Sequence, residues 1–514
     1  MARKIITPGI IIISLVIIIG LLLASILLIV WNEEMWIPPS GEVSLNDDGG
    51  SGNQRSVLGS SAQGVPEPIQ SPTPDVPHPL PALRQEAEQY IVQPRDSLHQ
   101  IAQSFLVSVD AIVDANEIDQ PDLLEVGQVL TIPAPKPEGT GPGLKIIPDS
   151  ELIYGPVSGD FRLAEFVHQK EGYLSGYREE VGDRQMSGVK IVERIAQEFS
   201  VNPRLLLAVL EFQSGWVTNA DPDPATLDYP IGVAVEWRQG LYNQLAWAAD
   251  NLNRGFYMWR VNALAIWILA DGTILYIDPT INAGTAGVQH FFSQIYDRAE
   301  WDIAVDASGL LSTYTDLFGY PFQYSLEPIL PPTLEQPQMQ LPFELGETWS
   351  YTGGPHGGWG SGSAWAAIDF APPGEALGCV ESDAWVVAVA DGLILRARDG
   401  AVVQDLDSDG LEGTGWTVLY MHVESRDRVK PGTYLQAGDP IGHPSCEGGV
   451  SSGTHLHLAR RYNGEWIPAD QDIPFVLDGW TSQGLGREYD GYLIRDGQQI
   501  EAWEGRESAN AIQR

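Results

Sequence analysis

The chain has 514 residues, 43% of them hydrophobic, and 68 acidic against 29 basic side chains give a formal net charge of −39. This length accommodates several domains of roughly 100–200 residues each. Such a negative charge argues against nucleic acid as a partner, because phosphate binding needs a basic surface.

Residues 1–31 predict a cytoplasmic tip and a transmembrane anchor. The apolar run Ile5–Val30 is long enough to cross a hydrocarbon core of about 30 Å. Arg3 and Lys4 precede it and two glutamates follow it, so the N-terminus stays cytoplasmic and the rest is exported. The alternative is a cleaved signal peptide, although the run is long for one. We expect a single-pass protein of the cell membrane whose C-terminal domains lie in the cell-wall space.

Three segments of low complexity divide the exported part. Residues 32–88 are rich in Gly, Ser, Pro and Gln, which predicts a disordered linker, because this composition cannot bury a core. Further Pro- and Gly-rich linkers are expected at 133–143 and 328–342. Three folded pieces remain between and after these segments.

The first piece, residues 89–134, predicts a strand, two short helices and a closing strand. Apolar residues recur at helical spacing after Asp96 and Ser97, which suit a helix N-terminus. The piece resembles a LysM domain in the following residues: Tyr90, Val92, Asp96-Ser97-Leu98, Ile101-Ala102, Phe105, Val107-Ser108, Asn116, Gly127-Gln128, Leu130 and Ile132-Pro133. The resemblance implies binding of glycans that contain N-acetylglucosamine, such as peptidoglycan.

The second piece, residues 148–326, predicts a mainly helical domain. Helical apolar spacing marks 189–199 and 203–212, and Pro203 suits a first helical turn. The stretch Leu205–Trp216 resembles the helix-to-loop region of lysozyme-like lytic transglycosylases. Tryptophans at helical spacing could stack on sugars or belong to the core.

This middle domain is expected to be non-catalytic. The lytic transglycosylase family places its acidic residue before a serine, and the residue before Ser214 is Gln213. An amide cannot donate the proton that glycosidic cleavage requires. Glu211 lies about 200° away around the helix and points elsewhere. We expect a glycan-binding or spacer domain here, and a glycosidase remains the competing hypothesis.

The third piece, residues 343–480, predicts a mainly antiparallel β domain and holds five of the nine histidines. Side chains alternate along a strand, so His455 and His457 point to one face. His422 ends another apolar run, and Asp369 follows a third. His356 lies in a Gly-rich stretch that we expect to be a flexible loop. Histidine is the commonest metal ligand and the readiest base at neutral pH.

The third piece resembles the lysostaphin-type, β-lytic (staphylolysin-like) zinc endopeptidases. The resemblance also includes Val429-Lys430-Pro431-Gly432, Ala437-Gly438-Asp439, Ile441-Gly442 and Ser452-Gly453-Thr454-His455-Leu456-His457. Many members place a histidine four residues before the aspartate, where this chain has Trp365. The β-lytic branch has it further upstream in a Gly-rich loop, which His356 fits.

The resemblance implies one zinc ion held by His356, Asp369 and His457, with His422 and His455 as catalytic histidines. Three protein ligands leave a fourth position for water, whose pKa zinc lowers towards about 7. The two further histidines would handle protons and the developing oxyanion. The alternative is a degenerate member that binds the wall and acts as an adaptor.

Four further features of this piece carry predictions. Asp405, Asp407 and Asp409 resemble the opening of a calcium loop, with a solvated acidic turn as the alternative. Given export, Cys379 and Cys446 are predicted to form a disulfide between the ligand-bearing regions. His443 is expected in a surface loop. Three tryptophans could line a groove or be buried: Trp359, Trp365 and Trp416.

Together these features predict a multidomain α+β protein. It comprises a transmembrane helix, a small βααβ LysM domain, a mainly α lysozyme-like domain and a mainly β peptidase domain. Residues 481–514 are expected to add closing strands and a disordered tail. The predicted function is a membrane-anchored, LysM-targeted zinc metalloendopeptidase that cuts stem or bridge peptides of peptidoglycan. The competing prediction is an inactive wall-binding scaffold or an activator of other wall hydrolases.

Overall fold

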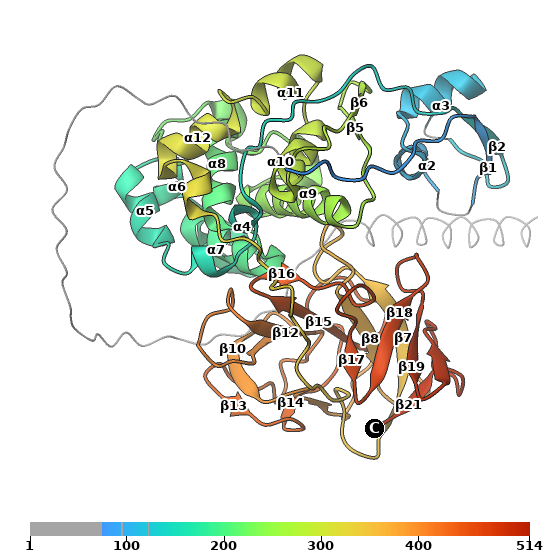
Figure 1. Ribbon diagram of the computed structural model, residues 1–514. Helices are drawn as coiled ribbons and strands as arrows, with labels where there is room; N and C mark the ends of the chain where they lie inside the picture. Colours follow the sequence, from blue (N-terminus) through green and yellow to red (C-terminus); the bar gives the residue numbers. More distant parts are fainter. Residues whose placement is uncertain (1–74, 94–95, 122) are drawn as a thin grey trace, which may run out of the picture.

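The structure is a computed structural model that describes residues 75–93, 96–121 and 123–514. The predicted transmembrane anchor and most of the predicted first linker lie outside these residues. Among the residues that are described, no helix is both long and apolar enough to cross a bilayer. The described chain forms a small unit, a helical unit and a β-rich unit, and the helical unit packs against both others (Figure 1).

The small unit has the predicted order of strand, helix, helix and strand. Its elements are β1 (Glu88–Ile91), α2 (Leu98–Phe105), α3 (Val109–Asn116) and β2 (Val129–Ile132). At the start of α2, Ser97 Oγ accepts from the Gln100 N–H while Gln100 Oε1 accepts from the Ser97 N–H, a capping box that satisfies two free donors. Ile112 and Leu130 are fully buried in its core.

The described end of the first predicted linker is ordered, so the predicted disorder is wrong for residues 75–88. The His78 ring stacks on Trp259 at 4.3 Å between ring centroids, and Lys145 Nζ lies 2.8 Å from Asp75 Oδ1. The second predicted linker is also attached, since the Glu138 N–H donates to the Ile274 carbonyl. Both segments form backbone hydrogen bonds with the helical unit. Their composition alone suggests linkers without such contacts.

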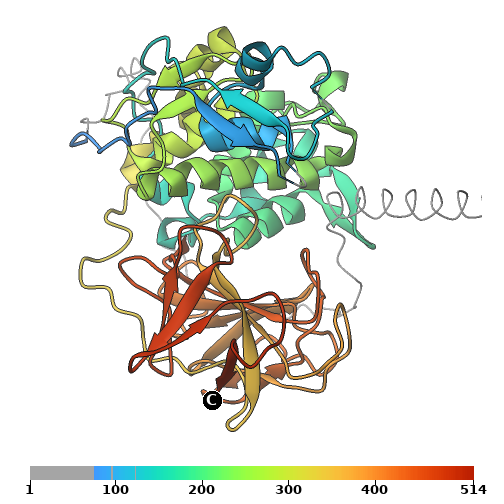
Figure 2. The same ribbon diagram turned by 90° about the vertical axis from the view of Figure 1, so that its right-hand side faces the viewer.

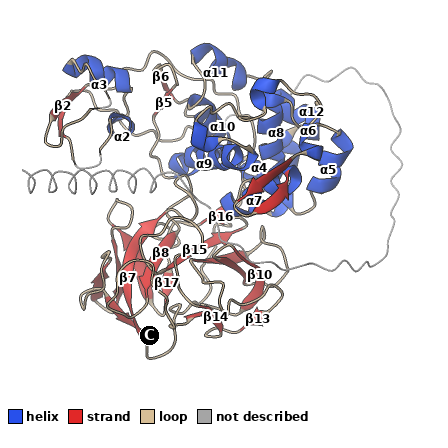
Figure 3. Ribbon diagram, turned by 180° about the vertical axis from the view of Figure 1, so that it is seen from behind, coloured by secondary structure: helices blue, strands red, loops and turns tan. Residues whose placement is uncertain are grey.

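The helical unit is dominated by packed helices with two short hairpins. Its elements are α4 (Asp149–Leu152), α5 (Leu163–Lys170), α6 (Tyr173–Gly176), β3 (Arg178–Val181), β4 (Arg184–Ser187), α7 (Gly188–Phe199), α8 (Pro203–Ser214), α9 (Leu241–Arg260), β5 (Ile266–Ile268), β6 (Ile274–Tyr276), α10 (Ala283–Ser293), α11 (Arg298–Ala304) and α12 (Leu310–Phe318). Helices gather in this half of the molecule and strands in the other half (Figure 3).

Helices α7 and α8 confirm the predicted helical spacing, and their ends follow local rules. The Ser187 hydroxyl accepts from the Lys190 N–H at the start of α7, and Asn202 caps α8. Pro203 occupies the first turn of α8, where no backbone donor is needed. Gly215 ends α8 with φ +67°, a left-handed conformation that glycine adopts at little cost.

The large sheet of the β-rich unit contains nine strands within the described chain, and every pairing in it is antiparallel. Its order is β13-β10-β11-β12-β15-β8-β7-β21, and β16 also pairs with β15. These strands are β7 (Thr348–His356), β8 (Ala367–Ala371), β10 (Gly392–Arg398), β11 (Ala401–Asp405), β12 (Trp416–Met421), β13 (Tyr434–Leu435), β15 (Leu456–Tyr462), β16 (Glu465–Trp466) and β21 (Ala511–Gln513).

The large sheet is buried on both faces. One face carries Ile368 and Leu458, which belong to the core of the β-rich unit itself. The opposite face carries Ala367 and Ala459, which pack into the core of the helical unit. Two directions of view show the helical unit over this part of the sheet (Figures 1 and 2). The two units therefore share one continuous apolar core.

Smaller strands complete the β-rich unit and reach the end of the chain. They are β9 (Val386–Val387), β14 (Pro440–Gly442), β17 (Val476–Leu477), β18 (Trp480–Gly484), β19 (Gly491–Arg495) and β20 (Gln498–Glu501). The predicted closing strands are thus present. The predicted disordered tail is wrong, because Ile512 of β21 pairs with Trp349 of β7 and is 1% exposed.

Candidate metal centre

The three predicted metal ligands come from three neighbouring strands of the large sheet. Asp369 in β8 lies directly opposite His457 in β15. Directly opposed residues of an antiparallel pair point to the same face of the sheet. His356 is the last residue of β7, which pairs with the other edge of β8. The sheet register therefore gathers residues that are far apart in the sequence.

His356 lies at the end of a strand and is 3% exposed, so the predicted flexible loop is wrong. The β7–β8 pairing shifts register on either side of Gly353, and such irregularities re-aim the side chains that follow them. A Cβ at Gly353 would stand 2.7 Å from Oδ2 of Asp369. The glycine thus lets β7 continue past the carboxylate.

The nearest polar atoms of the three side chains form a small triangle. Nε2 of His356 is 2.9 Å from Nδ1 of His457, and each nitrogen is 3.3 Å from Oδ1 of Asp369. Ligand atoms about 2.1 Å from a tetrahedral zinc ion are about 3.4 Å from one another. Within the described chain, Oδ1 of Asp369 is buried and accepts no hydrogen bond. Two imidazoles, a carboxylate and this spacing fit a zinc ion.

Backbone carbonyls select the tautomer of both histidine ligands. Nδ1 of His356 lies 2.8 Å from the Gly354 carbonyl, and Nε2 of His457 lies 3.1 Å from the Gly358 carbonyl. A carbonyl can only accept, so each of these nitrogens carries the proton. The lone pairs of the other two nitrogens then point into the triangle, as metal ligation requires.

The two predicted catalytic histidines lie beside this triangle. The His422 and His455 ring centroids are 4.4 Å apart, and Nε2 of His455 is 3.8 Å from Oδ2 of Asp369. Nδ1 of His422 contacts the Glu447 carbonyl at 3.1 Å, and Nδ1 of His455 contacts the Gly453 carbonyl at 2.7 Å. Both histidines therefore keep Nε2 free for proton transfer.

Burial and charge set the protonation of the cluster. Burial lowers the pKa of His422 well below its usual value, and the neighbouring His455 lowers it further. Burial alone would raise the pKa of Asp369, but the neighbouring imidazoles of His356 and His455 hold it well below its usual value. At neutral pH the site therefore combines an ionised carboxylate with a neutral His422.

Tyr489 belongs to the site but was missed from the sequence. Its ring stacks on His356 with 4.2 Å between centroids, and its N–H donates to the Pro355 carbonyl. The ring covers one face of this ligand. No motif marks Tyr489, because it approaches through the folding of the C-terminal strands.

Cys379 and Cys446 form the predicted disulfide, with 5.7 Å between their Cα atoms. The bond joins the loop after β8 to the segment that follows β14. Glu447, next to Cys446, provides the carbonyl that orients His422. The disulfide therefore holds a segment that supports a predicted catalytic histidine.

The acidic triad Asp405, Asp407 and Asp409 is brought together, but local hydrogen bonds explain its shape. One carboxylate oxygen from each of the three residues lies within 4.8 Å of the other two. The Asp405 carboxylate accepts from the N–H groups of Asp407, Ser408 and Gly410, as in a side-chain-stabilised turn. The predicted calcium site gains no support from this arrangement.

His443 is 4% exposed, so its predicted position in a surface loop is wrong. Its Nδ1 contacts the Ala384 carbonyl at 2.9 Å, and its ring lies 4.0 Å from that of Trp385. Pairing of β14 with β9 brings it inward. Of the three tryptophans that could line a groove or be buried, Trp359 and Trp416 are each only 9% exposed, and Trp365 is half-buried.

In the helical unit, Glu211 and Gln213 form hydrogen bonds within the domain. Glu211 Oε2 accepts from the N–H groups of Val217 and Thr218. Gln213 Oε1 accepts from the hydroxyl of Tyr296. These contacts account for the two side chains locally, and the expectation of a non-catalytic domain stays a prediction.

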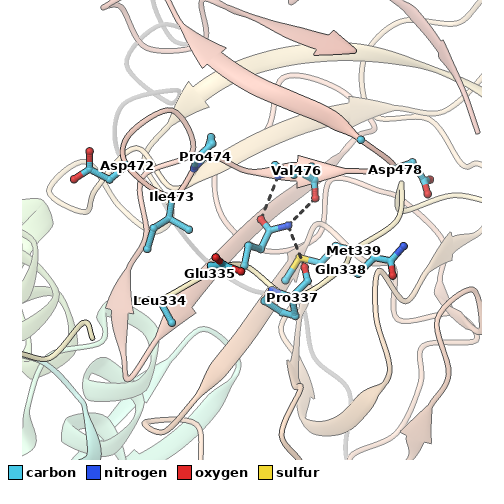
Figure 4. A pocket seen from close by; sticks show the side chains of 12 residues that line it. Leu334, Glu335, Pro337, Gln338, Met339, Asp472, Ile473, Pro474, Val476 and Asp478 are labelled. Carbon is cyan, nitrogen blue, oxygen red and sulfur yellow. Dashed lines mark hydrogen bonds between the residues drawn. The ribbon is translucent and has the colours of Figure 1, made fainter. Parts of the chain in front are cut away.

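A cavity of about 600 Å³ lies away from the histidines, between residues 334–339 and 472–479 (Figure 4). Gln336 lines this cavity, and its side chain hydrogen-bonds both backbone groups of Val476. No histidine lines it among the described residues. The cavity is therefore separate from the candidate metal centre.

Comparison with protein families identifies three regions. Residues 90–133 match the LysM domain, 145–332 match the LasA N-terminal domain and 368–468 match peptidase family M23. The chain thus carries these three domains, which confirms the LysM and lysostaphin-type, β-lytic resemblances. The lysozyme-like character of the middle region stays a prediction. The M23 match includes Asp369 and His457 but begins after His356.

Individual relatives are distant. Protease LasA of Pseudomonas aeruginosa (strain UCBPP-PA14) is 24% identical over 344 residues, covering 62% of this chain and 74% of the relative. The beta-lytic metalloendopeptidase of Lysobacter enzymogenes is 25% identical over 167 residues, covering 31% and 90%. Among solved structures, the M23 metalloprotease pseudoalterin from the deep sea is 26% identical, covers 33% of this chain and 96% of its own, and has a TM-score of 0.27.

Proposed function

We propose that this chain, with its LysM, LasA N-terminal and M23 peptidase domains, is a zinc-dependent metalloendopeptidase that hydrolyses peptide cross-links of peptidoglycan. One observation carries the proposal: two imidazole nitrogens and a carboxylate oxygen meet within 2.9–3.3 Å, with both tautomers set for metal binding. The similarity to relatives named as a protease and a metalloendopeptidase supports the same reaction class.

In this proposal His356, Asp369 and His457 hold the ion. Bound zinc supplies Lewis-acid chemistry, which polarises the scissile carbonyl and makes water a stronger nucleophile. The free Nε2 atoms of His422 and His455 lie beside the ligands, where one can accept the proton of the attacking water. The other, once protonated, can donate a hydrogen bond to the oxyanion and a proton to the departing amine.

The remaining domains would deliver the enzyme to its substrate. A LysM domain that binds glycan strands raises the local concentration of wall peptides around the peptidase domain. We further propose that the apolar run Ile5–Val30 anchors the chain in the cell membrane, with the domains on the wall side. The support for this anchor is the sequence pattern of basic, apolar and acidic residues.

The test is the purified full-length chain on isolated peptidoglycan. We expect one zinc ion per chain and release of new amino groups, which stops with a chelator and returns with zinc. The Asp369→Asn variant should release none. Wall binding without zinc or cleavage would instead support the scaffold hypothesis, and new reducing ends would support a glycosidase.

A further inference from the structure

We infer that Asp250, in helix α9 of the helical unit, is a positioning residue for the metal centre of the peptidase domain. It acts on the ligand loop, which we define as residues 357–363, directly after His356. The inference rests on the proposed function, because it concerns the affinity of the proposed zinc site. It assigns the helical unit a part in building that site, which a spacer or glycan-binding role does not include.

Asp250 holds the ligand loop through both of its carboxylate oxygens. Oδ2 accepts from the Ser361 hydroxyl at 2.6 Å, and Oδ1 accepts from the Gly362 N–H at 2.8 Å. Arg254, one turn further along α9, donates to the Ser361 carbonyl at 3.2 Å and to its hydroxyl at 3.0 Å. Two side chains of one helix therefore hold the loop at Ser361, and Asp250 also holds Gly362.

The loop approaches α9 so closely that only glycine fits at two positions. A Cβ at Gly362 would stand 1.8 Å from the Asp250 carbonyl oxygen, and one at Gly360 would stand 2.4 Å from Asp250 Oδ1. Trp359 meets Phe199 of α7 edge-on, with 6.4 Å between ring centroids. The loop is therefore closely packed against the helical unit.

The same loop orients one ligand and follows another. The Gly358 carbonyl accepts the proton on Nε2 of His457, which leaves Nδ1 free for the metal. The loop is closed on itself, because Ser363 Oγ accepts from the Trp359 N–H and Gly358 donates to the Ala364 carbonyl. A shift of the loop therefore moves the carbonyl that selects the His457 tautomer.

An outside anchor is needed because the loop is rich in glycine. Residues 357, 358, 360 and 362 are all glycine, and glycine has the largest conformational freedom to lose on ordering. Mutation of a group that hydrogen-bonds a metal ligand and orients it typically lowers metal affinity about 10- to 100-fold. The helical unit supplies the order that the loop sequence lacks.

The experiment compares zinc affinity in full-length variants by competition with a chromophoric chelator. Asp250→Ala should weaken zinc binding about 10- to 100-fold and change the visible spectrum of the cobalt-substituted protein, which reports ligand geometry. Asp250→Asn keeps an acceptor for the Gly362 N–H and should lie between Asp250→Ala and the unchanged chain. Ser361→Ala, at an exposed position, removes contacts to both α9 side chains without threatening the fold and should also weaken binding.

The matched control is Arg184→Gln, which breaks an ion pair with Asp399 between the same two units but away from the loop. Its zinc affinity and cobalt spectrum should equal those of the unchanged chain. Equal affinity and spectrum for Asp250→Ala and Ser361→Ala would overturn the inference while leaving the proposed function intact. An unchanged chain that binds no zinc would overturn the proposed function and this inference with it.

Discussion

Asp369 of β8 and His457 of β15 lie directly opposite each other in an antiparallel pair, and Oδ1 of the first is 3.3 Å from Nδ1 of the second. The register of two buried strands therefore places two of the three proposed ligands. A slip of one residue in this pairing would put the two side chains on opposite faces of the sheet. The third ligand, His356, comes from the end of β7, and the loop that follows it orients the His457 ring.

Asp369→Asn should abolish zinc retention while the sheet remains folded. The change removes the negative charge that the ion needs but keeps the size of the side chain, so we expect affinity to fall at least about 100-fold. Metal analysis after dialysis and far-UV circular dichroism measure the two effects. His168→Ala, which removes an exposed imidazole from α5, serves as the control and should retain zinc.

His455→Ala should lower kcat about 10²- to 10⁴-fold, the usual contribution of a positioned acid or base. Zinc content should not change, since in the proposal this residue is no ligand and its Nε2 stands 3.8 Å from Asp369 Oδ2. Steady-state kinetics on a soluble cross-link peptide, with metal analysis of the same sample, checks both. Loss of zinc together with activity would instead make His455 a ligand.

The double change Cys379→Ser and Cys446→Ser should lower the free energy of unfolding of the peptidase domain by about 4 kcal/mol. This is the contribution expected from loop-closure entropy when a disulfide joins residues 67 apart in the sequence. The urea midpoint of the variant should match that of the reduced unchanged chain. An unaffected midpoint would show that the surrounding hydrogen bonds suffice. Activity should also fall, because Glu447 beside Cys446 supports His422.

Stability should fall in acid as Glu412 is protonated. Burial alone would raise the pKa of Glu412, but Arg396 and Arg461 lower it from 4.5 to about 2. Its stabilising contribution is therefore complete above pH 4.5 and is lost as the pH falls towards 2. A shift of this size corresponds to about 3 kcal/mol, measurable as the pH dependence of the urea midpoint.

Glu412→Gln separates this residue from other acid-labile groups. At neutral pH the variant leaves the buried guanidinium of Arg461 and the half-buried one of Arg396 without their carboxylate, and it should lose about 3–5 kcal/mol. Near pH 2 the variant and the unchanged chain should converge. If the urea midpoints of the variant and the unchanged chain differed by the same amount at every pH, the acid sensitivity would belong to another carboxylate.

Local patterns predicted most secondary structure, and the resemblance to the β-lytic endopeptidases supplied the candidate ligands. The apolar spacing of 189–199 predicted α7, and the alternation around His455 and His457 predicted that both face one side. These features depend on neighbours in the chain, which a single sequence displays. The same local view misjudged His356, because a Gly-rich stretch suggests flexibility until its pairing with β8 is known.

Long-range packing decided the rest. The sequence contains no sign that Asp250 would hold the loop after His356, that Tyr489 would stack on that histidine, or that β21 would end the sheet. Each contact joins segments that only the folded chain brings together. Residue types and their spacing thus specify which chemistry the chain carries, because ligand atoms and strand periodicity are local properties. Folding alone selects the tautomers, burial and supports that make a cluster of side chains into a metal site.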